Sequence, residues 1–89
     1  MKHAGVAALD RLSDLLQELR NRIGLVERRP GIFYIKSKAF LHFHEDGAGL
    51  FADLRQHSEW LRLPVNDPAD QAMLLAAIDR TLEARGNRS

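Results

Sequence analysis

The chain has 89 residues, 45% of them hydrophobic and 28% charged, which suits one globular domain with a single small core. Thirteen basic and twelve acidic side chains leave a formal charge of +1, which argues against a nucleic-acid or anionic-membrane partner. The absence of cysteine excludes disulfides and zinc–thiolate sites. No apolar stretch approaches the roughly 20 residues of a membrane span, so we predict one soluble, cytoplasmic domain over residues 1–89.

The first predicted element is an amphipathic helix over residues 6–23. Apolar side chains recur from this segment onward at steps of three and four residues, namely Leu9, Leu12, Leu16, Leu19, Ile23 and, just beyond the helix, Val26. Such a stripe could form a coiled-coil seam, but it is interrupted by Gly24 and Pro30 after less than three heptads. Packing on the domain's own sheet is the favoured interpretation, and docking of a partner protein on the stripe is the alternative.

From Ile32 onward a period of two predicts an antiparallel sheet over residues 32–65. Residues 32–35, 39–44 and 50–55 read as three strands. Residues 59–65 would add a short edge strand, because Pro64 cannot donate a ladder hydrogen bond. We therefore expect three or four strands.

A second helix is predicted over residues 68–85. Asp67 suits its N-cap, Pro68 its first position, and Gly86 its C-terminal stop. Its apolar face would comprise Met73, Leu74, Ala77, Ile78 and Leu82. The predicted fold class is α+β, in the order helix, antiparallel sheet, helix, with both helices on one sheet face.

The turn at residues 46–49, with two glycines, predicts the register of the hairpin 40–54. His42 would face Asp53 and His44 would face Phe51, whereas Leu41, Phe43, Leu50, Ala52 and Leu54 would point to the opposite, helix-covered face. The uncovered face is expected to bind a partner protein, a second copy of the chain or a small hydrophobic ligand. Its candidate ligand-binding residues are Tyr34, Phe40, His42, His44, Phe51 and Trp60.

The His-x-His spacing allows two kinds of chemistry. His42 and His44 point to one side of a strand, and with Asp53 opposite they could bind a transition metal. Alternatively, Asp53 could orient His42 as a general base in a metal-free enzyme, although no nucleophile or phosphate loop accompanies them. The favoured interpretation is structural: His42 hydrogen-bonds Asp53, no cofactor is expected, and the domain is a non-catalytic interaction module, with a homodimer as the expected assembly.

The run Lys38-Ala39-Phe40-Leu41-His42-Phe43-His44, followed by Gly49 to Leu54, resembles the central hairpin of the luciferase-like domain. In that domain, found in many bacterial proteins and in fungal luciferases, a strand with His-x-His also leads through a glycine turn into an Asp-containing strand. The chain lacks the histidine-containing insert that follows there. The resemblance therefore implies a small bacterial α+β domain with this hairpin, and it does not imply an oxidative or light-emitting reaction.

Overall fold

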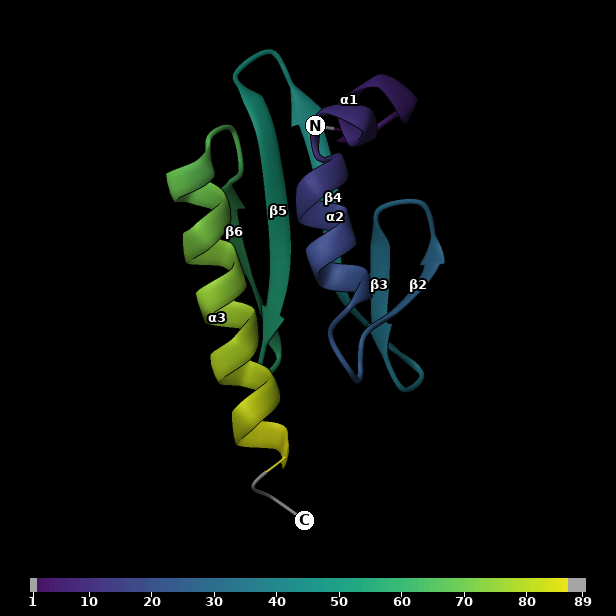
Figure 1. Ribbon diagram of the computed structural model, residues 1–89, viewed down its shortest axis with the longest axis vertical. Coiled ribbons are helices and arrows are strands. Elements are labelled where there is room, and N and C mark those ends of the chain that lie inside the picture. Colours follow the sequence, from purple (N-terminus) through teal and green to yellow (C-terminus); the bar gives the residue numbers. More distant parts are fainter. Residues whose placement is uncertain (1, 87–89) are drawn as a thin grey trace.

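The computed structural model describes residues 2–86, so Met1 and residues 87–89 of the predicted domain lie outside the described part. It combines helices with one antiparallel sheet, as predicted (Figure 1). The elements in chain order are β1 (Lys2–His3), α1 (Val6–Arg11), α2 (Ser13–Arg20), β2 (Val26–Arg29), β3 (Ile32–Ile35), β4 (Lys38–Asp46), β5 (Gly49–Gln56), β6 (Glu59–Pro64) and α3 (Pro68–Gly86).

The sheet has six strands, so the prediction of three or four is wrong. Five of them follow the order β2-β3-β4-β5-β6, and β1 pairs with β4. Because β5 occupies one edge of β4, β1 lies along the other edge, beyond the end of β3. The unpredicted strands β1 and β2 are short and lack alternating apolar residues, the pattern that reveals a strand.

The predicted helix 6–23 is two shorter helices. The backbone leaves helical geometry at Leu12 (φ −103°, ψ 14°), where α1 gives way to α2, and α2 ends at Arg20. Ile23 consequently lies outside the helix and is 97% exposed. Four leucines of this segment are buried in the core, Leu12, Leu15, Leu16 and Leu19, which agrees with packing on the domain's own sheet.

Helix α3 starts at the predicted N-cap. Asp67 Oδ1 accepts a hydrogen bond from the Asp70 N–H at 2.8 Å, and Asp70 Oδ2 accepts one from the Asn66 N–H at 3.1 Å. These side chains satisfy backbone donors near the helix start. Leu74, Ala77 and Ile78 are buried as predicted. Met73 is 67% exposed, so its predicted place in the core is wrong.

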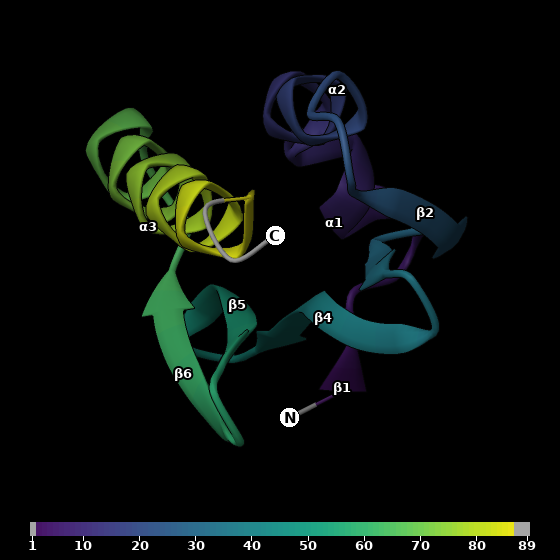
Figure 2. The same cartoon turned by 90° about the horizontal axis from the view of Figure 1, so that it is seen from below.

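Helices α2 and α3 lie on the same side of the sheet, as predicted (Figure 2). Phe33, Phe43 and Leu54 are among the side chains buried between these helices and the sheet. We call the opposite side, which carries His42, His44, Phe51 and Asp53, the open face. Within residues 2–86, none of the helices has both the length and the apolar character that a membrane crossing needs.

The register of the β4–β5 hairpin is the predicted one. His42 pairs with Asp53 and His44 with Phe51. The hairpin closes at the pair Asp46–Gly49, and Gly49 has a φ of +132°, a value that favours glycine. Asp46 Oδ1 accepts a hydrogen bond from the Ala48 N–H at 2.7 Å, which supports the turn.

A β-bulge in β4 changes the position of Phe40. Phe33 pairs with Leu41, but Tyr34 pairs with Ala39, so Phe40 is an extra residue between them. Phe40 is 1% exposed and belongs to the core. Its predicted position on the open face is therefore wrong.

Candidate metal centre on the open face

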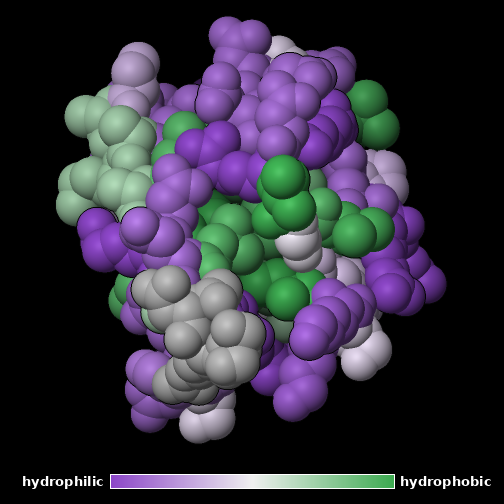
Figure 3. All heavy atoms as spheres, turned by 60° about the horizontal axis from the view of Figure 1, so that its bottom comes forward, coloured by the Kyte–Doolittle hydropathy of each residue, from purple (hydrophilic) through white to green (hydrophobic). Residues whose placement is uncertain are grey.

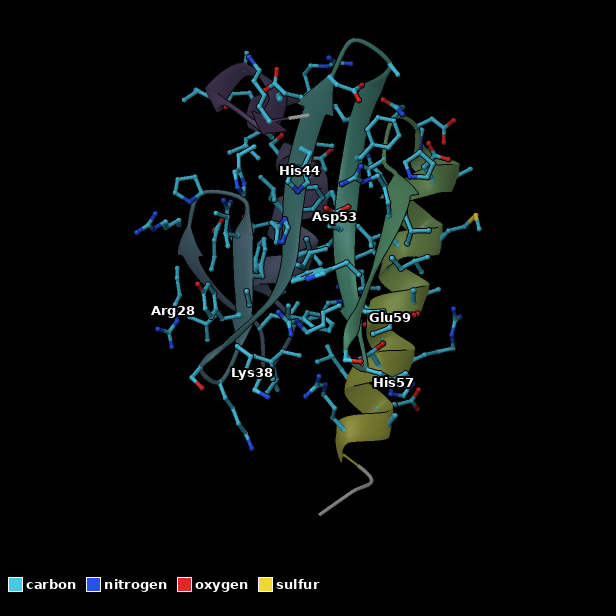
Figure 4. The ribbon with its side chains drawn as sticks, turned by 180° about the vertical axis from the view of Figure 1, so that it is seen from behind. Arg28, Lys38, His44, Asp53, His57 and Glu59 are labelled. Atoms are coloured by element: carbon cyan, nitrogen blue, oxygen red, sulfur yellow. The ribbon has the colours of Figure 1, made fainter. Side chains whose placement is uncertain are left out.

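Asp53 is a buried carboxylate on the open face, with an exposed fraction of 6% (Figure 4). Arg62 of β6 donates to both of its oxygens, from Nε to Oδ1 at 2.8 Å and from Nη2 to Oδ2 at 3.0 Å. These hydrogen bonds lower the pKa of Asp53 below its usual value, although burial by itself would raise it. Asp53 is therefore ionised near neutral pH and ties β5 to its neighbours.

His44, rather than His42, is the histidine that contacts Asp53. Its Nε2 lies 3.0 Å from Asp53 Oδ2 and 2.8 Å from Nδ1 of His42, so the contacts run from His42 through His44 to the carboxylate. The predicted direct hydrogen bond between His42 and Asp53 is replaced by this chain. The side chain of His44 is only 13% exposed.

The contact with Asp53 determines the tautomer of His44. A neutral imidazole that donates from Nε2 to a carboxylate carries its lone pair on Nδ1. That Nδ1 is buried and has no hydrogen-bond partner within the part of the chain that the structure describes. The cluster thus contains a nitrogen that could still accept a hydrogen bond or bind a metal. Leaving a buried polar atom without a partner costs free energy.

His3 is a third histidine of the cluster, and sequence reasoning missed it. It pairs with His44, and one nitrogen from each of His3, His42 and His44 lies within 4.8 Å of the other two. The Gly5 N–H donates to Glu45 Oε2 at 2.6 Å, and the Ala4 N–H donates to the Phe43 carbonyl at 3.0 Å. These bonds hold β1 against β4 and bring His3 to the open face.

The pKa of His42 lies below its usual value. Burial is the main cause, because it disfavours the charged imidazolium, and the nearby His44 acts in the same direction against the opposing charge of Asp53. His42 is therefore neutral near neutral pH. A neutral imidazole is the form that binds a metal.

Trp60 is the predicted aromatic residue that contacts the histidines. The centroid of its ring lies 4.6 Å from that of His42, and the residue is 41% exposed. The guanidinium of Arg55 lies 4.6 Å from the centroid of the same ring. The exposed ring of Trp60 thus lies next to both the histidine cluster and the guanidinium of Arg55.

The other predicted aromatic residues occupy different parts of the open face. Phe51 is partly buried and lies between His44 and Pro64 in neighbouring strands. Tyr34, on β3, has the guanidinium of Arg28 4.8 Å from its ring centroid. Tyr34 is therefore placed for a cation contact and is not part of the histidine cluster.

No protein-family model matches the chain, and no match was found among curated proteins or solved structures. The resemblance of the 40–54 hairpin to the luciferase-like domain stays a prediction. The chemistry of the open face must accordingly be inferred from its geometry. That geometry places three imidazoles together, with a buried carboxylate beside one of them.

Proposed function

We propose that the domain binds a divalent transition-metal ion on its open face, with His3, His42 and His44 as ligands. The supporting observation is that their ligand nitrogens lie within 4.8 Å of one another. Nitrogens bound to one zinc ion at about 2.0–2.1 Å lie about 3.3 Å apart in a tetrahedral arrangement. Because His3 is exposed, rotation of its side chain can close the remaining distance.

The surroundings of the cluster favour a metal over a purely structural network. Imidazole nitrogens suit zinc, copper, nickel and iron, and carboxylates commonly orient metal-binding histidines. Asp53 lies in this position relative to His44, while Arg62 neutralises its charge. Three protein ligands leave one tetrahedral position free, as in catalytic zinc sites. The exposed ring of Trp60, next to His42, would flank a molecule bound there.

A second candidate is the non-catalytic interaction module, in which the open face binds a protein, a second copy of the chain or a hydrophobic ligand without metal. It is favoured by the exposed Trp60, because large aromatic residues are frequent anchors of interfaces. A metal-free acid–base enzyme would use His44 as the oriented base, since His44 contacts Asp53.

The decisive experiment is calorimetric titration of tag-free protein with Zn²⁺, supported by the absorption spectrum of the Co²⁺ form. We expect one ion per chain. His3→Ala removes an exposed ligand with little effect on folding and should weaken binding at least about tenfold, since even neighbours of metal ligands contribute 10- to 100-fold. His57→Asn is the matched control, because His57 is exposed and Asn tolerates its positive φ of 57°.

Equal Zn²⁺ affinity in His3→Ala and His57→Asn would contradict the proposed ligand set. Absence of stoichiometric binding to the wild-type chain would contradict the metal proposal altogether. In that case, a solution mass of two chains that returns to one chain in Trp60→Ala would favour the interaction module.

A further inference from the structure

A pocket of about 740 Å³ lies between the segment after α2, the β3–β4 turn, Arg55 of β5 and the C-terminal half of α3, and its lining includes none of the three clustered histidines. Figure 3 shows a hydrophobic hollow at this end of the molecule, surrounded by hydrophilic side chains. Its apolar lining comprises Ile23, Ile35, Ala39, Phe40 and Leu82. The volume lies in the range of about 300–1,000 Å³ that is typical of small-molecule sites.

We propose that this pocket binds a small amphipathic anion, a carboxylate on an apolar body. Four basic side chains line it, Lys36, Lys38, Arg55 and Arg85, and no acidic side chain does. An apolar floor with a cationic rim matches the two parts of such a molecule. The proposal does not depend on metal binding at the open face.

The basic side chains of the pocket are available for an anion. Within residues 2–86, none of the four takes part in an ion pair. Nε of Arg55 is buried and lacks a hydrogen-bond partner among the described residues. Like charges around an apolar hollow repel one another, and a bound anion would relieve this repulsion. A carboxylate would also form charge-assisted hydrogen bonds with a guanidinium.

Ile23 supplies a second, independent argument. Its side chain is 97% exposed at the edge of the pocket, so it buries almost no apolar area within the domain. An apolar ligand body that covers this side chain would remove it from water, at a gain of about 25 cal/mol per Å². The exposed isoleucine therefore favours a ligand with a substantial apolar part over a simple inorganic anion.

The test is titration of the full chain with decanoate below its micelle concentration, monitored by amide chemical shifts in NMR. Decanol and decyltrimethylammonium serve as neutral and cationic probes with the same alkyl length. We expect saturable shifts at Gly24, Ser37 and Lys38 with decanoate, and binding at least about tenfold weaker for the other two probes. Addition of EDTA should leave decanoate binding unchanged, which separates this site from the metal centre.

Variants locate the site. Lys38→Glu/Arg85→Glu should weaken decanoate binding at least about tenfold. Arg11→Glu/Arg29→Glu, with the same change in net charge on exposed residues outside the pocket, should not. If circular dichroism shows that the first variant is misfolded, Lys38→Ala/Arg85→Ala replaces it, with the same direction expected.

The apolar wall is tested separately. Ile23→Ser should weaken decanoate binding severalfold, whereas Val6→Ser, at an 80% exposed position outside the pocket, should leave it unchanged. Equal affinity for the three probes, or unchanged binding in the charge-reversed variant, would overturn the proposal. A doubled solution mass at saturation would assign the pocket to a second copy of the chain and would also overturn it.

Discussion

Alternate residues of β4 and β5 lie in contrasting surroundings. On the helix side, Leu41, Phe43, Ala52 and Leu54 are at most 1% exposed and belong to the core. On the open face, the same strands carry His42, His44 and Asp53, which contact one another and Arg62 through polar atoms. Stability and candidate chemistry thus come from neighbouring residues on opposite faces. Substitutions should affect these two properties separately.

The largest expected effect is a difference in stability between two Phe→Ala variants, one on each face of the sheet. Phe43→Ala opens a cavity in the core and should lower the free energy of unfolding by about 3–5 kcal/mol. Phe51→Ala, at a partly buried position on the open face, should cost less than about 2 kcal/mol. Urea denaturation measures both values. Equal losses would mean that the open face is covered in solution, as in a dimer.

The next largest loss of stability is expected at the β4–β5 turn, whose register determines which residues lie on each face of the sheet. Gly49→Ala would place a Cβ 2.5 Å from Asn66 Oδ1, the atom that accepts the Leu50 N–H, at a φ of +132°. We expect a loss of about 1–3 kcal/mol in urea denaturation. Gly47→Ala is the matched control, because its Cβ would meet no atom within 4 Å. A similar loss in both variants would contradict a specific role of Gly49.

A smaller effect is expected from the polar network of the open face. Arg62→Ala leaves the buried carboxylate of Asp53 without its guanidinium and should lower the free energy of unfolding, by less than the Gly49→Ala substitution does because Arg62 is half exposed. The pKa of Asp53, measured by NMR, should rise. Arg11→Ala, at an exposed position, should change stability by less than about 0.5 kcal/mol. An unchanged Asp53 pKa in Arg62→Ala would contradict the proposed cause of its shift.

The smallest effect is a pH dependence at Glu27, away from the open face. Burial would raise the pKa of Glu27, but hydrogen bonds from Arg20 at 2.6 Å and from the Gly31 N–H at 2.9 Å lower it. Because the folded-state pKa is below the unfolded one, this stabilisation is complete above the unfolded pKa of about 4.3 and disappears as the pH falls through the folded value.

Glu27→Gln should therefore destabilise the domain by less than about 1 kcal/mol at pH 7, since the partner Arg20 is substantially exposed. Urea denaturation at several pH values should show that the difference between the two proteins shrinks below the unfolded pKa. A difference that is constant down to acid pH would contradict this role of the carboxylate.

The central hairpin could be predicted from sequence because its determinants are local. Alternating apolar residues assign the faces, and the glycines of the turn fix the register that brings His42 opposite Asp53. The start of α3 could also be predicted, because Asp67 and Pro68 are adjacent residues typical of a helix N-terminus. These features predicted the α+β class and the register that pairs His42 with Asp53 and His44 with Phe51.

The other features depend on contacts between distant segments. The two residues of β1 show no periodicity, and only their pairing with β4 brings His3 to His44. The bulge that moves Phe40 into the core likewise depends on how β3 pairs with β4. The cationic pocket joins four separate segments. His3 lies far from the His-x-His strand along the sequence, so the sequence gives no sign that it joins His42 and His44.

Trp60 is the single tryptophan of the chain, and its position has a practical consequence. Its ring contacts His42 on one side and the guanidinium of Arg55, which also lines the cationic pocket, on another. Intrinsic fluorescence should therefore respond both to an ion on the histidines and to a molecule that draws Arg55 away. Because coupling between two binding equilibria is reciprocal, one unlabelled emission signal can reveal whether occupancy of either site changes affinity at the other.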